Sequence, residues 1–147
     1  MLKIIYIALF LCFSFQSLFA NEYFLTLRND KVNLRQGPSF EYPIKLFYKK
    51  KFLPVLIQDE FENFRRVRDH ENNTGWIHIS QLSKKKAAIT IDDDQLIFNR
   101  PSIYSKPSAI LKKGRLCKIH KCNDEWCKVS VEKYKGWVKK NVLWGLL

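Results

Sequence analysis

The sequence of 147 residues contains three histidines, no Cys-x-x-Cys pair and no conspicuous pair of carboxylates. The missing Cys-x-x-Cys pair excludes a thioredoxin-type redox centre. A cysteine nucleophile needs a base and an orienting group, yet His70 and His78 lie between residues 21 and 82, where there is no cysteine. Because no constellation of catalytic groups stands out and no room remains for a separate catalytic domain, we expect a protein that is not an enzyme and uses no cofactor.

Long apolar runs are also absent, except at the N-terminus. There, Lys3 precedes a largely apolar run of twelve residues, from Ile4 to Phe15, and the segment that follows ends in Ala20. This layout is typical of a secretory signal peptide, here residues 1–20, cleaved near Ala20. A retained membrane anchor is the alternative, but the run falls short of the ~18–20 residues that cross a bilayer. We therefore expect a periplasmic or secreted protein whose mature chain has no transmembrane segment.

Acidic residues are too few to balance the basic ones. The chain has 14 Asp and Glu against 26 Lys and Arg, a formal charge of +12, which falls by one to +11 when Lys3 leaves with the signal peptide. Such an excess attracts anionic polymers, although a general enrichment in lysine without any function explains it equally well. Export makes nucleic acid the least favoured of the anionic partners, and we expect no nucleic-acid binding.

Helical patterns are few, and short runs of β-branched or aromatic residues take their place. Runs such as FRRVRD and KGWVKK are separated by Pro, Gly, Asn and Asp, which predicts a compact all-β fold. The runs also repeat along the chain at spacings of 61 to 63 residues. Repetition in the same order predicts two copies of one small β module. The clearest matches pair Phe64 with Trp126, Val67 with Val129, and Gly75-Trp76 with Gly136-Trp137.

The opening of the first copy, VNLRQGPSFEY, contains an Asn-x-Arg-x-Gly-Pro pattern from Asn33 to Pro38. Together with its aromatic-x-x-Val strand and its Gly-Trp strand, this pattern resembles a bacterial SH3-like (SH3b) domain. The second copy keeps Pro101 but lacks the Asn and the Gly, and its end resembles exported tandem SH3-like proteins with a Cys-x-x-x-Trp-Cys hairpin and a terminal Leu-Trp-Gly. The resemblance implies an all-β chain of two tandem small SH3-like β-barrels after the signal peptide. It implies a fold and a compartment, and no defined activity.

The repeat also predicts the domain boundaries. We expect a first domain over residues 21–82, a linker over residues 83–94 and a second domain over residues 95–147. The linker, SKKKAAITIDDD, is expected to contain at most one short strand. Its three lysines are expected to be solvated, with contact to an anionic partner as the alternative.

Aromatic residues and glycines are the candidates for structural roles. A domain of about 55 residues buries little apolar area, so large aromatic side chains must supply much of its core. We expect Gly37 to enter a tight turn that only glycine adopts freely, and Gly75 and Gly136 to let Trp76 and Trp137 lie across each barrel. The residues expected to be structural are Gly37, Pro38, Phe64, Gly75, Trp76, Trp126, Gly136 and Trp137.

Three cysteines remain beyond the N-terminal segment, namely Cys117, Cys122 and Cys127, and export permits a disulfide. Alignment of the two copies places Cys122 and Cys127 at polar positions on the rim of a hairpin and Cys117 at an apolar position. We predict a Cys122–Cys127 disulfide with Cys117 free; a Cys117–Cys127 disulfide is the alternative. A zinc site that adds His120 is disfavoured because Cys117 points to the opposite face of its strand, and we expect no metal.

These features predict a non-enzymatic exported binding or scaffolding module that recognises peptidoglycan or an envelope protein. The alternative is an accessory or regulatory subunit of a cell-wall-modifying enzyme complex. The aromatic side chains that suit a binding groove are Phe40, Tyr42, Tyr48 and Tyr104. Ordinary packing in loops and strands is the alternative for all four.

Overall fold

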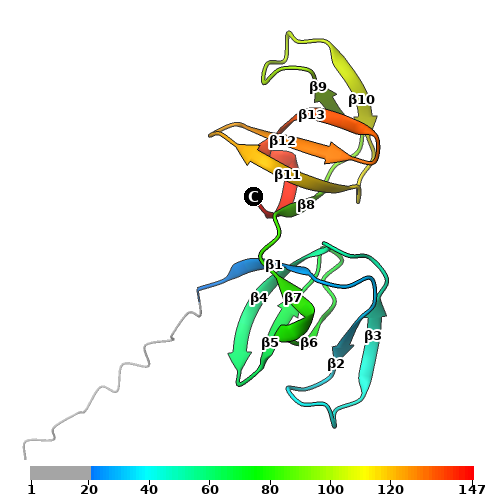
Figure 1. Ribbon diagram of the computed structural model, residues 1–147, viewed down its shortest axis with the longest axis vertical. Helices are drawn as coiled ribbons and strands as arrows, with labels where there is room; N and C mark the ends of the chain where they lie inside the picture. Colours follow the sequence, from blue (N-terminus) through cyan, green and yellow to red (C-terminus); the bar gives the residue numbers. More distant parts are fainter. Residues whose placement is uncertain (1–20) are drawn as a thin grey trace, which may run out of the picture.

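A computed structural model describes residues 21–147 as two all-β units that follow one another along the chain (Figure 1). The predicted signal peptide, residues 1–20 with its cleavage site near Ala20, lies outside the described residues. Each unit contains one seven-stranded sheet in which the paired strands are antiparallel. The predicted all-β fold of two tandem modules is confirmed. Within residues 21–147, no helix is long and apolar enough to cross a membrane.

The first unit runs from the N-terminal strand to the basic segment near residue 84. It contains β1 (Tyr23–Leu27), β2 (Val32–Arg35), β3 (Ile44–Tyr48), β4 (Pro54–Phe61), β5 (Phe64–Arg68), β6 (Thr74–His78), the 3₁₀ helix η1 (Ile79–Gln81) and β7 (Leu82–Ser83).

The second unit repeats the same elements. It contains β8 (Ala87–Thr90), β9 (Gln95–Phe98), β10 (Pro107–Leu111), β11 (Leu116–Cys122), β12 (Trp126–Val131), β13 (Tyr134–Lys139), the 3₁₀ helix η2 (Lys140–Val142) and β14 (Leu143–Leu146).

The two sheets have the same topology, which corrects the predicted linker. The strand order is β3-β2-β6-β5-β4-β1-β7 in the first sheet and β10-β9-β13-β12-β11-β8-β14 in the second. Strand β8 therefore takes the place of β1 as the first strand of its unit. All four of its residues are buried, and it pairs with both β11 and β14. Residues 87–90 therefore belong to the second unit. The covalent connection between the two units is the short basic segment between β7 and β8.

Alternation along the strands builds a core inside each unit. Side chains at every second position point to the same face of a sheet, and in β12 the buried residues include Cys127, Val129 and Val131. Val55, Val67 and Ile77, each at most 1% exposed, occupy the matching face in the first unit. Burial of branched aliphatic side chains is therefore the main source of stability in both units.

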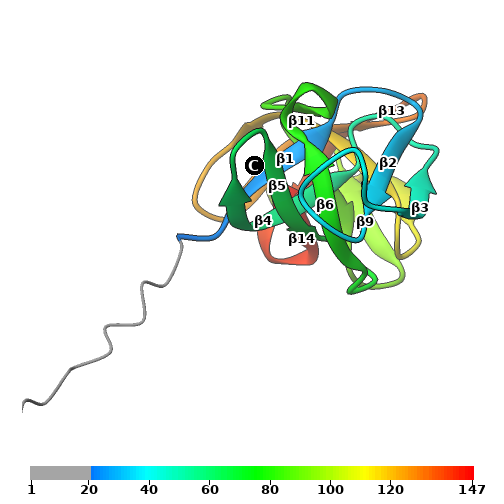
Figure 2. The same ribbon diagram turned by 90° about the horizontal axis from the view of Figure 1, so that it is seen from below.

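The two units also pack against each other across a shared apolar junction. The side chain of Ile89 on β8 is buried with the core of the first unit, whereas its neighbour Ala88 joins the core of the second. Leu116 on β11 packs against the first core as well. The rings of Phe24 on β1 and Trp144 on β14 meet edge to face, with centroids 4.8 Å apart. Figure 1 accordingly places the C-terminus close to the junction, and Figure 2 shows the same region from below.

Candidate functional site

The loop between β2 and β3, residues 36–43, is held in shape by Arg35 at the end of β2. The Nη1 atom of Arg35 donates hydrogen bonds to the backbone oxygens of Phe40 (3.1 Å) and Tyr42 (2.9 Å). The guanidinium carbon also lies 5.3 Å from the centre of the Phe40 ring, which adds a cation–π contact. A charged donor with several fixed partners orders a loop more strongly than a neutral one. Arg35 thus positions two of the predicted binding residues, although sequence reasoning did not select it.

Phe40 presents the most accessible ring of the first unit. It is 64% exposed, yet its ring centre lies 5.2 Å from that of Phe64 and 5.1 Å from that of His78. Phe64 is 6% exposed and meets His78 at 5.1 Å, because the two residues are paired across β5 and β6. We call Phe40, Phe64 and His78 the aromatic platform. Its buried part anchors the exposed Phe40 ring, which offers an apolar face to a ligand.

His78 contributes a polar edge to the platform. The backbone N–H of Ser80 donates to Nδ1 of His78 at 3.2 Å, and the Ser80 hydroxyl lies 2.7 Å from the same atom. Since Nδ1 acts as an acceptor, a neutral ring carries its proton on Nε2. From the sequence, His78 was considered only as a possible base for a cysteine nucleophile. Its position opposite Phe64 in the hairpin is the signal that could have identified it.

Tyr42 lies beside the platform on the same loop and is 48% exposed. Its ring covers Gly37 so closely that a Cβ atom on Gly37 would lie 2.5 Å from the ring carbons. The only glycines with positive φ among the described residues are Gly114 and Gly145. The expectation that Gly37 is needed for a special turn conformation was therefore wrong. At Gly37, the Tyr42 ring occupies the space that a side chain would take.

Tyr48 does not join the other predicted binding residues. It is 9% exposed and belongs to the first core, and its hydroxyl donates a 3.0 Å hydrogen bond to Oδ2 of Asp69. Burial, followed by the nearby Asp69 charge, raises the pKa of Tyr48 above its ordinary value. Asp69 also accepts hydrogen bonds from the backbone N–H groups of Glu71 and Asn73. The role of Tyr48 is thus to hold the β5–β6 turn, which corrects its assignment to a binding groove.

The second unit lacks an equivalent platform. Its predicted binding residue, Tyr104, is 93% exposed in the loop between β9 and β10, and no aromatic contact among residues 21–147 involves it. Trp126, which corresponds to Phe64, is 5% exposed and packs edge to face with Phe98 at 5.5 Å. Lys139 covers Trp126 with its ammonium group 4.4 Å from the ring centre. The structure therefore brings Phe40 and Tyr42 together and leaves Tyr104 separate.

The two Gly-Trp strands place their tryptophans on the outer face of each sheet, which corrects the expectation that these rings cross the barrels. In β6, Gly75 and Ile77 are buried whereas Trp76 is half-buried, and Trp137 in β13 is half-buried in the same way. The glycine is required on the inner face. A Cβ atom on Gly136 would lie 2.5 Å from the carbonyl oxygen of Phe98.

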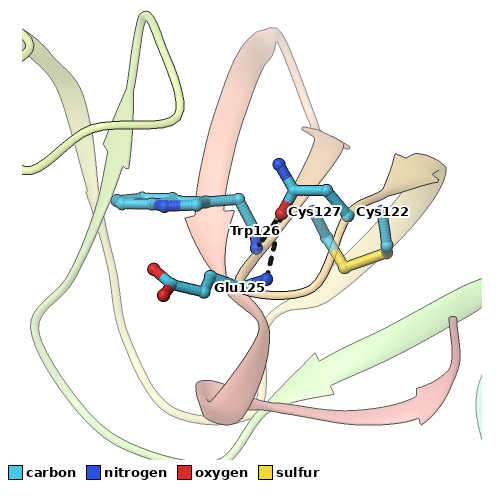
Figure 3. Close-up of a disulfide and its surroundings, with 5 residues drawn as sticks. Cys122, Glu125, Trp126 and Cys127 are labelled. Carbon is cyan, nitrogen blue, oxygen red and sulfur yellow. Dashed lines mark hydrogen bonds between the residues drawn. A yellow bond between two sulfur atoms is a disulfide. The ribbon is translucent and has the colours of Figure 1, made fainter.

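The predicted disulfide between Cys122 and Cys127 is confirmed. The two residues are directly paired in the β11–β12 hairpin, with their Cα atoms 4.0 Å apart. Figure 3 shows the Trp126 indole on the side of the strand away from the disulfide. The side-chain oxygen of Asn123 accepts the backbone N–H groups of Glu125 (3.0 Å) and Trp126 (2.7 Å), which closes the turn. Cys127 is fully buried, so its expected place at a polar rim was wrong.

Cys117 is free and buried, as predicted. Burial raises the pKa of its thiol to about 12, so the thiol stays protonated at neutral pH. His120, the fourth residue of the zinc alternative, is exposed and bonds to the Ser130 hydroxyl. Since two of the four residues form the disulfide, that zinc alternative does not apply. Within residues 21–147, no group of three or more metal-ligating side chains comes together.

The family of the chain follows from its two repeated units. The family model described as the bacterial SH3 domain matches residues 28–84 and again residues 92–145. The chain belongs to the bacterial SH3 domain family. The matched ranges contain every strand of both SH3 units except β1 and β8, with Leu146 at the end of β14 also outside them. Among the curated proteins, no relative matches the chain.

Several solved structures are similar to the SH3 tandem. NlpC2 and NlpC1 from Trichomonas vaginalis share 15% and 16% identity with it, each with a TM-score of 0.37. The matches cover 84% and 83% of this chain but 48% and 45% of those chains. An NlpC/P60 family protein from Bacillus cereus ATCC 10987 shares 11% identity over 83% of this chain and 56% of that chain, with a TM-score of 0.38. The SH3 tandem thus spans about half the length of these proteins.

Proposed function

We propose that this tandem SH3 protein is a non-enzymatic binding module of the bacterial cell envelope, periplasmic or secreted, that attaches to peptidoglycan through its first unit. The observation that carries the proposal is the Phe40 ring, which is 64% exposed but supported from behind by Phe64 and His78. An exposed ring on a rigid support loses little side-chain entropy when it binds a ligand. Arg35 fixes the loop on which that ring lies.

The chemistry of the platform suits a ligand with both apolar and polar groups, such as the glycan and stem peptide of the wall. Phe40 supplies an apolar face, and the His78 ring supplies an N–H donor, at Nε2, at its edge. Tyr42, half exposed on the same loop, adds a hydroxyl that donates and accepts hydrogen bonds. The disulfide and the family of the chain support a location outside the cytoplasm.

Co-sedimentation with purified sacculi tests this proposal. We expect residues 21–147 to pellet with sacculi, and Phe40→Ala to weaken binding by about tenfold, as for a central aromatic contact. Tyr104→Ala is the matched control because it removes an exposed ring from the corresponding loop of the second unit, and it should bind normally. Failure to pellet at low salt would contradict the proposal. Retention by a membrane or periplasmic protein in its place would favour an accessory subunit.

The absence of catalytic activity is also part of the proposal. Incubation of the purified chain with sacculi is expected to release no soluble muropeptides. Release that persists in Phe40→Ala would indicate a catalytic group elsewhere, and release that disappears with binding would indicate one near the platform. Either result would show that the protein is an enzyme and would contradict the proposed non-enzymatic function.

A further inference from the structure

A second candidate site lies at the junction of the two SH3 units, and its lining shares no residue with the aromatic platform. A cleft of about 990 Å³ opens there. Its apolar wall is formed by Phe24 and Leu25 of β1, Leu82 of β7 and Leu146 of β14, so both units contribute to it. A concave apolar surface of this size is typical of a binding site. The proposed wall-binding function makes no use of it.

Basic residues line this cleft and continue into a second hollow beside it. Arg28 and Lys84 line both cavities, and the second, of about 540 Å³, adds Lys51 and Lys85. We call the two connected cavities the cationic groove. None of the ion pairs found within residues 21–147 involves these four side chains. Their charge is therefore available to an anionic partner.

Backbone conformation marks the basic end of the groove as well. Phe52 lines the second hollow and has a φ of 64°, a left-handed conformation that costs free energy in a residue this large. Its N–H is held by the carbonyl oxygen of Leu27 at 2.9 Å. The ammonium groups of Lys51 and Lys118 lie 5.2 and 5.4 Å from its ring centre. Conformations of this kind concentrate at functional sites, and this one fixes an aromatic ring among lysines.

We propose that the cationic groove binds an acidic segment of a partner protein in which carboxylates alternate with apolar side chains. Charge complementarity selects an acidic ligand. The basic side chains are spread along both cavities, from Lys86 in the first to Lys51 in the second. A peptide carries its carboxylates along its length, whereas a lipid carries its charge at one end. This distribution of charge therefore favours a peptide. Together with the proposed attachment to peptidoglycan, on which this role rests, the groove joins the wall to a second protein.

Peptide binding can be measured directly by fluorescence anisotropy with the chain of residues 21–147. The probe is a labelled synthetic peptide in which Glu alternates with Leu. One control peptide replaces every Glu by Gln, and a second replaces every Leu by Ser. We expect saturable binding of the first peptide and affinities at least about tenfold lower for both controls, because each lacks one of the two complementary features.

Variants of the groove connect binding to this site. Lys84→Glu with Lys85→Glu should weaken binding by about tenfold or more. The matched control is Lys133→Glu with Lys135→Glu, which makes the same change in net charge at exposed positions outside the groove. In the apolar part, Ile79→Ser should weaken binding several-fold. Its control, Ile91→Ser, changes a residue of nearly equal exposure, 38% against 39%, outside the groove.

Three results would overturn the inference. If the Gln peptide bound as tightly as the Glu peptide, acidic groups would not be required. If the groove and control lysine variants lost the same affinity, the effect would come from net charge and not from this site. Tight binding to phosphatidylglycerol vesicles that requires Lys84 and Lys85, without binding of the acidic peptide, would assign the groove to a lipid. Each groove variant should still pellet with sacculi, so failure of this proposal is distinguishable from failure of the wall-binding function.

Discussion

The rings of Phe24 and Trp144 meet edge to face at 4.8 Å and join the first strand of one SH3 unit to the last strand of the other. Ile89 lies at the same junction, buried in the core of the first unit although it belongs to a strand of the second. Aromatic contacts of this geometry add to the burial of apolar area. The tandem therefore behaves as one packed body at its junction, and the cationic groove depends on that packing.

Replacing Trp144 by Ala tests this coupling. Because the ring is half-buried, we expect a loss of about 2 kcal/mol in the free energy of unfolding, together with weaker binding of the acidic peptide. Urea unfolding, followed by tryptophan fluorescence, measures the first effect. Phe47→Ala removes a 47% exposed ring from the edge strand β3 and should change stability by less than about 0.5 kcal/mol. Equal losses in the two variants would show that the Phe24–Trp144 contact does not couple the units.

Two glycines should differ in their tolerance of a methyl group. A Cβ atom on Gly136 would lie 2.5 Å from the Phe98 carbonyl oxygen, which is part of the sheet and cannot move. We expect Gly136→Ala to cost about 1–3 kcal/mol. The three atoms nearest to a Cβ atom on Gly37 all belong to the half-exposed Tyr42 ring, which can swing outward. Gly37→Ala should therefore cost less, and thermal unfolding of the two variants measures the difference.

A double variant separates the contact of Gly37 from its backbone conformation. In Tyr42→Ala, the space above Gly37 is empty, so adding Gly37→Ala should have almost no further effect on the melting temperature. A further loss equal to that in the wild-type background would indicate that the backbone of Gly37, and not the Tyr42 ring, requires glycine.

The repeat in the sequence predicted more of the fold than any single motif did. The spacing of Phe64 and Trp126 located equivalent strands, and the polar counterparts of Cys122 and Cys127 pointed to the disulfide that the structure contains. The short strand allowed in the linker was not assigned to the second unit, because Ala87–Thr90 lies between lysines and aspartates. Its burial depends on pairing with β14, more than fifty residues later in the chain. Such nonlocal pairing has no local signal.

The candidate site was harder to predict than the fold, for a related reason. Phe40, Tyr42 and Tyr48 look alike in the sequence, but whether each ring is exposed depends on contacts with distant residues. Tyr48 is buried because its hydroxyl finds Asp69, 21 residues away. Phe40 is fixed because the pairing of β5 with β6 brings Phe64 and His78 beneath it. Composition identified the correct residue class, and only tertiary structure separates its members.

The Cys122–Cys127 disulfide closes a short loop, so its removal should have a moderate effect. On the chain-entropy estimate, reduction or the double substitution Cys122→Ala and Cys127→Ala costs about 2 kcal/mol. The melting temperature should fall, while binding to sacculi through the first unit should persist. Thiol titration of the denatured, unreduced chain of residues 21–147 should find only Cys117. Three free thiols would show that the disulfide does not form.

Alkaline pH should reveal the buried Cys117 thiol. Its pKa is raised from 9.0 to about 12 by burial, which disfavours the thiolate. As the pH rises above 9, the unfolded chain loses this proton while the folded chain keeps it. The contribution of this thiol to the free energy of unfolding is therefore complete below pH 9 and disappears progressively up to about pH 12. The raised pKa of Tyr48 acts in the same direction above pH 10.

Cys117→Ala isolates this contribution. Without this thiol, we expect the free energy of unfolding to fall less steeply between pH 9 and 12, and the difference in slope corresponds to the release of about one proton on unfolding. Between pH 6 and 8 the slope should not change. Urea unfolding at each pH provides the measurement. It is best made in the Cys122→Ala, Cys127→Ala background, where Cys117 has no disulfide to attack. An identical slope with and without Cys117 would mean that the thiol ionises as readily in the folded chain as in the unfolded one, and that the second core admits water.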